Sequence, residues 1–277
     1  LGWSYYGNPG QALKIYRLLT AAYQFSRDEK YLAPLDTALH IAENYTPSKG
    51  FTPEPPSAEW QKQLLHTWLE SGGFTPLLLR CKRATGTTRF DPYLTKGEKG
   101  PLTEFMIDGT VKPAIDRLES LLEKGRPMHH NFYTSIRYNF PYWTQEALCT
   151  DRVYMWGMQE LYSLMTGATS FWGDSMPPDH LVTWHHRNAE FAAMVRSTEA
   201  GSIQIRFYHF DTEDTDFGLH LWNIPFGHYA VEWGVWNRNT TVLTGKKEFD
   251  YAERGQQIRL DLPARMDLLI RINRQGN

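Results

Sequence analysis

The sequence has few of the features that assign a protein to a class at once. Only two of its 277 residues are cysteines, Cys81 and Cys149, so it can form at most one disulfide bond. Their spacing fits neither a zinc site nor a redox motif. No run of about 18 or more apolar residues occurs, so the sequence offers no candidate membrane-spanning helix and we expect no membrane partner.

A strong charge of either sign is also absent. The formal net charge is −2, so there is no net basic field of the kind that nucleic-acid binding uses, and we expect no nucleic-acid partner. Neither a P-loop nor a glycine-rich dinucleotide pattern is present, which disfavours nucleotide chemistry. No HExxH or cysteine-rich spacing occurs, so we expect neither a metal nor a cofactor.

Aromatic residues, in contrast, are abundant. They make up 14% of the chain and include 10 Trp. This composition is typical of a globular protein with a substantial core and not of a disordered chain. The first residue is Leu1 and no signal-like segment precedes the first helix, so we expect the chain to be the mature or truncated part of a longer protein.

The first part of the chain is predicted to be helical. Between residues 11 and 165 the apolar residues mostly recur at helical spacing. The clearest helices are expected at 60–69, 111–122 and 148–165. The first follows Ser57, and the second follows Thr110, which we expect to be its N-cap. Three segments that each follow an apolar helix place an aromatic residue five positions after a Ser or Thr, at 26–31, 85–90 and 166–171. We interpret them as the turns of αα-hairpins.

After Asn188 the apolar period falls to two, which predicts strands. Seven are expected, without an intervening helix, so an antiparallel sheet or sandwich is predicted. They are 189–197, 202–210, 217–223, 228–236, 248–251, 257–262 and 266–272, with a turn at Gly245-Lys246 among those that separate them. The predicted organisation is an α+β chain with a helical-hairpin domain at 1–187 and an antiparallel β-domain at 188–277.

This order of elements resembles the (α/α)-toroid plus β-sandwich architecture of polysaccharide lyases and some glycoside hydrolases. The turn from Ser26 to Leu32 is similar to the loop that joins paired helices in that group, and the segments 207–210, 222–229 and 254–263 are similar to its terminal sheet. A complete toroid has more hairpins than this chain supplies. The resemblance therefore implies that a further N-terminal segment or another chain completes the ring.

The densest group of polar and aromatic residues lies between His129 and Trp143, where no helical or strand period fits. We interpret this segment, called the aromatic loop below, as a long loop between two helices, the kind of segment in which sites are often found. Its tyrosines and Trp143 suit stacking on the apolar faces of sugars, while Asn, Arg and His suit hydroxyl and carboxylate groups. A well-packed loop without a function is the alternative.

The resemblance to toroid lyases, which use Asn, His, Tyr and Arg, implies roles for residues of the aromatic loop. Cleavage of a uronate polymer by β-elimination needs neutralisation of the carboxylate, a base for the C5 proton and an acid for the leaving oxygen. The implied carboxylate ligand is Asn131 or Arg137, and Asn139 and Trp143 are further substrate contacts. The implied base is His129 or His130, and the implied acid is Tyr133 or Tyr138.

Outside the aromatic loop, three residues are further candidates for substrate binding. Glu146 lies near the start of the helix expected next and Arg152 lies within it, and a structural ion pair is the alternative interpretation of Arg152. His185 lies at the expected domain junction, beside His186, and such junctions often line clefts.

These patterns favour an enzyme that cleaves a complex, acidic polysaccharide by β-elimination. A glycoside hydrolase of the same build is one alternative, and a non-catalytic carbohydrate-binding or structural module of a larger protein is another. The expected partner is a polysaccharide or oligosaccharide. Because such a substrate is too large to import, a secreted or periplasmic location is expected.

Overall fold

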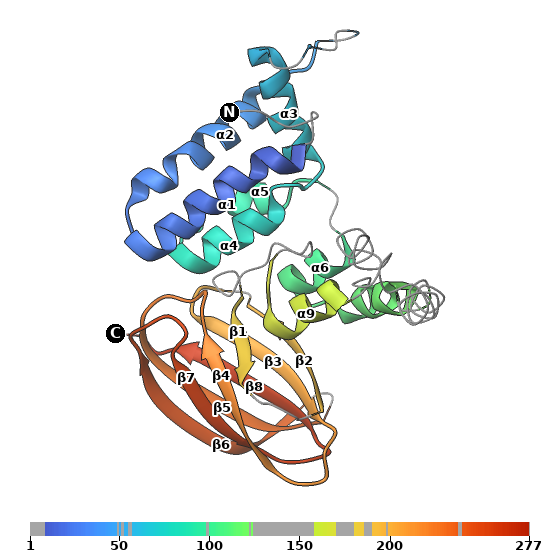
Figure 1. Cartoon of the computed structure of the whole chain (residues 1–277), viewed down its shortest axis with the longest axis vertical. Coiled ribbons are helices and arrows are strands. Elements are labelled where there is room, and N and C mark those ends of the chain that lie inside the picture. Colours follow the sequence, from blue (N-terminus) through green and yellow to red (C-terminus); the bar gives the residue numbers. More distant parts are fainter. Residues whose placement is uncertain are drawn as a thin grey trace, which may run out of the picture. The chain divides into compact units, whose positions relative to one another are not determined.

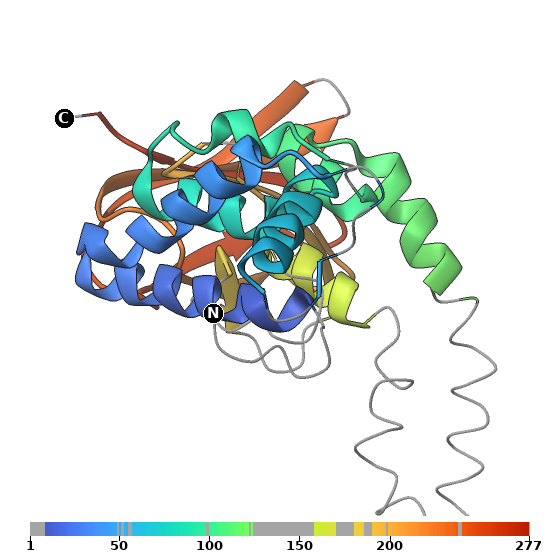
Figure 2. The same cartoon turned by 90° about the horizontal axis from the view of Figure 1, so that it is seen from above.

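The structure, a computed structural model, describes residues 9–48, 50, 53–54, 57–97, 100–121, 123, 158–169, 180–185, 190–197, 199–237 and 240–276. The chain divides into two compact units, Leu1–Lys99 and Gly100–Asn277. The first is helical, and the second combines helices with two antiparallel sheets (Figure 1 and Figure 2). The chain therefore has the predicted α+β class.

The first unit is built from apolar helix faces packed against one another. Helix α2 packs on α3, and α1 packs on α4. Leucines at helical spacing, such as Leu35 and Leu39 of α2 and Leu65 and Leu69 of α3, are buried. The described elements are α1 (Pro9–Ser26), η2 (Glu29–Tyr31), α2 (Ala33–Asn44), α3 (Ala58–Glu70), α4 (Thr75–Thr85) and α5 (Asp91–Leu94).

Two of the three turns that the sequence repeats lie against each other in this unit. Arg27, in the turn after α1, donates a hydrogen bond from Nη1 to the carbonyl oxygen of Ala84, 2.7 Å away at the end of α4. Arg89, in the turn after α4, forms ion pairs with Glu29 at 3.3 Å and Asp36 at 3.6 Å. Each turn therefore contributes an arginine that holds the other hairpin.

The helices predicted at 60–69 and 111–122 are confirmed over the residues that the structure describes, with the first running from Ala58 to Glu70. The hydroxyl of Ser57 accepts a hydrogen bond from the backbone N–H of Trp60, 3.2 Å away, and so caps α3. Residues 111–121 are helical, as expected. The helix expected at 148–165 is described only at its end, as α9 (Met158–Thr166).

The second unit contains two antiparallel sheets. The smaller has the strand order β1-β4-β7, and the larger has the order β2-β3-β8-β5-β6. The described elements of this unit with printed bounds are α6 (Pro101–Asp108), α9, β1 (Val182–His185), β2 (Phe191–Arg196), β3 (Ser202–His209), β4 (Thr215–Leu221), β5 (Gly227–Asn237), β6 (Thr240–Tyr251), β7 (Gln257–Leu262) and β8 (Asp267–Arg274).

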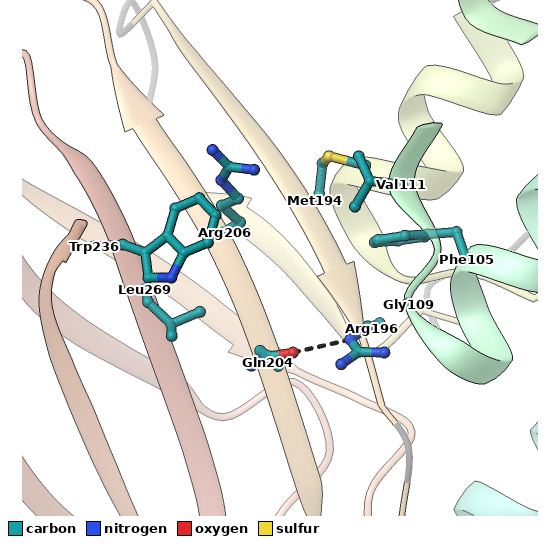
Figure 3. Close-up of a pocket in the computed structure, with 9 residues that line it drawn as sticks. All are labelled: Phe105, Gly109, Val111, Met194, Arg196, Gln204, Arg206, Trp236 and Leu269. Carbon is teal, nitrogen blue, oxygen red and sulfur yellow. Dashed lines mark hydrogen bonds between the residues drawn. The ribbon is translucent and has the colours of Figure 1, made fainter. Parts of the chain in front are cut away.

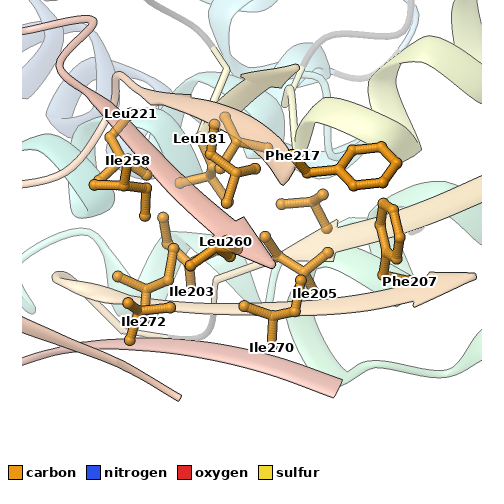
Figure 4. Close-up of a cluster of buried hydrophobic side chains, with 14 of the residues drawn as sticks. Leu181, Ile203, Ile205, Phe207, Phe217, Leu221, Ile258, Leu260, Ile270 and Ile272 are labelled. Atoms are coloured by element: carbon orange, nitrogen blue, oxygen red, sulfur yellow. The ribbon is translucent and has the colours of Figure 1, made fainter. Parts of the chain in front are cut away.

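The two sheets share one hydrophobic core. Alternate residues of β3 and β8, including Ile205 and Ile270, point to the same cluster as Phe217 of β4 and Leu260 of β7. Figure 4 shows these side chains meeting between the sheets. Because side chains of a strand alternate between its two faces, the residues between them lie on the outer faces of the sheets.

Strand prediction was wrong at two places. Strand β1 was not expected, and it pairs with β4 from Val182 to His185. The turn predicted at Gly245-Lys246 is instead part of β6, which pairs with β5 along its length. A Cβ atom at position 245 would lie 2.1 Å from the indole of Trp233, so the glycine allows a close approach of that ring and does not make a turn.

The predicted domain boundary between residues 187 and 188 falls within 186–189, outside the described residues, and stays a prediction. The described sheet strands begin at Val182, and the division into compact units follows Lys99. No described helix has both the length and the apolar character needed to span a bilayer.

Candidate functional site

Most of the site residues predicted from the sequence lie outside the described residues. This holds for every candidate catalytic residue and for all the substrate-binding candidates except His185, so their roles stay predictions. They are His129, His130, Asn131, Tyr133, Arg137, Tyr138, Asn139, Trp143, Glu146 and Arg152.

His185 lies on the outer face of the three-stranded sheet. It is the last residue of β1, where Val182 is part of the shared core and Trp184 packs against it. His185 therefore points away from the core with Thr183, and it is exposed. The residues nearest to it on this face come from β4 and β7.

A second histidine lies beside His185. The ring of His220, on β4, is 5.5 Å from that of His185, centroid to centroid, and the two planes are inclined at 79°. Nδ1 of His220 donates a hydrogen bond to the carbonyl oxygen of Gly255, 2.8 Å away. Because a carbonyl oxygen can only accept, Nδ1 carries the proton, and Nε2 of the neutral ring is left as an acceptor.

The strand register places further polar groups around the two histidines. His185 faces Gly218, which faces Arg259, and these three form one row across the sheet. The adjacent row on the same face is Thr183, His220 and Gln257. We call the group His185, His220, Gln257, Arg259 and Trp222 the histidine face.

Gly218 makes room for the amide of Gln257. A Cβ atom at Gly218 would lie 2.4 Å from Nε2 of Gln257 and 3.0 Å from the Cβ of His185, so no other residue fits without displacing them. Nε2 of Gln257 is buried and has no hydrogen-bond partner among the described residues. An unpaired buried N–H is costly, and it is a donor available to a bound ligand.

An indole and a guanidinium lie at the margins of the histidine face. The indole N–H of Trp222 donates to Oγ1 of Thr183, 2.9 Å away. The ring is half-buried and fixed against Gly255, where a Cβ atom would lie 2.8 Å from it. Arg259, about two-thirds exposed, forms an ion pair with Asp216 at 3.0 Å.

This arrangement provides acid–base groups and anion ligands together. Imidazole side chains are the commonest general acids and bases in enzymes. The Arg259 guanidinium and the Gln257 amide can both donate hydrogen bonds to a carboxylate. Sequence patterns indicated only His185, because His220, Gln257 and Arg259 are single polar residues in ordinary alternating strands.

Among the side chains that the structure describes, no group of three or more His, Cys, Asp or Glu residues could hold a metal ion. No protein-family model, curated protein or solved structure matches the chain. The candidate site therefore rests on the geometry of this chain alone.

Proposed function

We propose that the protein cleaves an acidic polysaccharide by β-elimination and that the histidine face contributes to the reaction. The observation that carries the proposal is the pair His185 and His220 beside the donors of Arg259 and Gln257. These groups match the three requirements of the reaction, namely a base, an acid and a ligand for the uronate carboxylate.

The proposed roles follow from the hydrogen bonds of each group. Nε2 of His220 removes the C5 proton of a uronate, because its other nitrogen is held by Gly255. The electron pair of the C5–H bond forms the C4=C5 double bond as the C4–O bond breaks, and His185 protonates the leaving oxygen. Arg259 and Gln257 hold the carboxylate, so that negative charge developing at C5 is stabilised.

The dimensions of the sheet suit a sugar ring. His185 and Arg259 lie on strands that flank β4, and neighbouring strands are about 4.8 Å apart. Their backbones are therefore separated by roughly 10 Å, with the glycine between them. Trp222 adds an aromatic surface on which a ring can stack.

The aromatic loop is proposed as a second part of the site. His129, His130, Tyr133 and Tyr138 remain candidates for the base and the acid, and Asn131 and Arg137 for the carboxylate.

We further propose that the helical hairpins belong to a toroid, that the two sheets form a sandwich, and that the protein is secreted or periplasmic. The hairpin turns that hold each other and the core shared by the two sheets support the architectural proposal.

The test is the release of unsaturated product from a panel of uronate polysaccharides, followed by ultraviolet absorbance. The active wild type is compared with His220→Asn, which replaces the imidazole base with an uncharged carboxamide that cannot take up the proton. We expect kcat to fall by about 10²- to 10⁴-fold. The matched control is His228→Asn, since His228 lies on β5 in the other sheet, where it contacts Asp250 at 2.8 Å.

Two outcomes would contradict the proposal. The first is the absence of unsaturated product on every polysaccharide of the panel. The second is an equal effect of His220→Asn and His228→Asn on kcat.

Hydrolysis is the second candidate function, and one observation favours it. Asp216 and Asp261 face each other in register on β4 and β7, on the same outer face. Directly opposed residues have Cβ atoms about 4.5–5.5 Å apart, a spacing from which a pair of carboxyl groups can act together. A hydrolase would release new reducing ends without ultraviolet absorbance, whereas a binding module would retain the polysaccharide without cleaving it.

A further inference from the structure

The outer face of the five-stranded sheet carries a pocket. It has a volume of about 150 Å³ and opens between this face and the segment that contains α6 and the start of the helix at 111–121. Figure 3 shows Phe105, Gly109 and Val111 on the helical side and Arg196, Arg206 and Trp236 on the sheet side. The pocket and the histidine face belong to different sheets and lie on opposite sides of the shared core.

The described residues that line the sheet side of the pocket include two guanidinium groups and no carboxylate. Arg196 and Arg206 line it together with Gln204, and the remaining lining residues carry no charge. Arg196 has no ion-pair partner among the described residues and is held by a hydrogen bond from Nε to Oε1 of Gln204, 2.9 Å away. Its Nη1 is buried without a hydrogen-bond partner there.

Arg206 is fixed before any ligand binds. It donates from Nε and Nη2 to the carboxylate of Asp267, at 3.2 and 2.7 Å. Its guanidinium carbon lies 3.8 Å from the ring centroid of Trp236, a short cation–π contact. This bidentate, stacked geometry uses one edge of the guanidinium and leaves Nη1 able to donate elsewhere.

The rest of the pocket is apolar and has room for one face of a ring. Phe105, Val111, Met194 and Leu269 provide aliphatic and aromatic contacts. Its volume of about 150 Å³ is near that of a protein cavity that accommodates a single benzene molecule. One face of a six-membered sugar ring can lie in this space, whereas its outer substituents and any longer oligosaccharide would have to extend out of it.

We propose that this pocket binds one carboxylate-bearing sugar residue, a uronate. The Arg196 and Arg206 guanidinium groups bind the carboxylate, and the ring lies against Trp236 and the apolar side chains. The choice of a sugar as the body of the anion rests on the proposed function. The pocket is a secondary binding site, separated from the histidine face by the core of the two sheets.

The test measures binding of methyl β-D-glucuronide to the intact protein by titration calorimetry, with methyl β-D-glucoside as the neutral counterpart. We expect the glucuronide to bind at least tenfold more tightly than the glucoside. Arg196→Met is expected to weaken binding of the glucuronide at least tenfold, because it removes the guanidinium that has no carboxylate partner. Lys247→Gln, which removes an exposed charge from β6, is the matched control and is expected to bind the glucuronide as the wild type does.

A second variant tests the pocket without removing a charge. Arg196 packs so closely against Gly109 that a Cβ atom at Gly109 would lie 2.0 Å from Nη1, so its replacement can disturb the fold. Val111→Phe keeps every charge and fills the pocket, and it is also expected to weaken binding at least tenfold. Thermal unfolding of each variant shows whether the fold is retained.

The binding titration and the cleavage assay report on the pocket and on the histidine face separately. Equal binding of glucuronide and glucoside, or wild-type binding of the glucuronide by a folded Val111→Phe variant, would overturn the pocket proposal. His220→Asn is expected to bind the glucuronide normally while losing cleavage. If the wild type binds the glucuronide but cleaves no polysaccharide of the panel, the pocket proposal holds and the proposed lyase activity is contradicted.

Discussion

His180 is a histidine buried in a neutral form. Its side chain is almost fully excluded from solvent, and its ring makes an edge contact with Tyr162, at 5.2 Å between centroids. Neither ring nitrogen has a hydrogen-bond partner among the described residues. Burial lowers the pKa of His180 to about 4, because the charged imidazolium would lose its hydration without a compensating contact.

This burial predicts a loss of stability in mild acid. Below about pH 6.5 the unfolded chain binds a proton at His180 that the folded chain does not bind until about pH 4. Stability therefore falls as the pH decreases between these values, by at most about 3 kcal/mol, and is unaffected by this group above the interval. His180→Phe keeps a ring and removes the titration, so denaturant unfolding at several pH values should show a smaller decrease for the variant. Parallel curves for the two proteins would contradict this explanation.

At the same scale, the aromatic residues of the two sheets divide between the shared core and the outer faces. Phe207 and Phe217 pack against each other in the shared core, with ring centroids 4.9 Å apart. Trp222 and Trp236 instead lie toward the outer faces, where each is fixed by a polar partner, Thr183 and Arg206 respectively. The aromatic residues, 14% of the chain, thus include both core residues and residues of the candidate binding surfaces.

At the scale of elements, strands β3, β5 and β8 form the centre of the larger sheet, and their inward residues meet those of the smaller one. Ile270 of β8 is fully buried in this core, between β3 and β5. Leu243 of β6 is 56% exposed on the edge strand. Replacement of the side chain by alanine is therefore expected to lower the free energy of unfolding much more at Ile270 than at Leu243.

Ile270→Ala is expected to lower the free energy of unfolding by about 2–5 kcal/mol, because it leaves a cavity between the sheets. Leu243→Ala is the control and is expected to change it by less than about 0.5 kcal/mol. Urea denaturation followed by tryptophan fluorescence measures both. A similar cost for both variants would mean that the two sheets do not share the core described here.

Local patterns predicted most elements but not all of them. The helix at 58–70 and the strands at 202–209 and 257–262 follow from apolar periodicity and from polar or turn residues at their ends. Strand β1 was missed because it has four residues and its alternation is too short to recognise. The turn predicted at Gly245 is wrong because glycine suits both a turn and the close approach of an indole, and only the pairing with Trp233 distinguishes the two.

At the scale of the whole molecule, the described residues of the core between the two sheets all belong to the second unit. The described members of the buried cluster between the sheets run from Leu181 to Ile272. Helix α9 contacts β1 and β2 and belongs to the same unit. None of the described residues between 9 and 97 belongs to this cluster.

A fragment spanning residues 100–277 is therefore expected to fold. A domain with its own core can in principle fold alone, and it should unfold in one cooperative transition. Near-ultraviolet circular dichroism during heating tests this, since the tryptophans and tyrosines packed between the sheets give a signal only when they are ordered. A fragment without such a signal, or with a broad non-cooperative transition, would contradict the division of the chain after Lys99.

The sequence by itself determined the α+β class, most helices and strands, and one residue of the histidine face, His185. It did so because apolar periods and capping residues act over a few neighbouring positions. Only the tertiary structure decided that His185, Gly218 and Arg259 share a row, and that Arg196 and Arg206 line a pocket with Trp236. These groupings depend on the register of strands that are distant in the sequence, and on a helical segment that covers one sheet. No local pattern encodes such pairings.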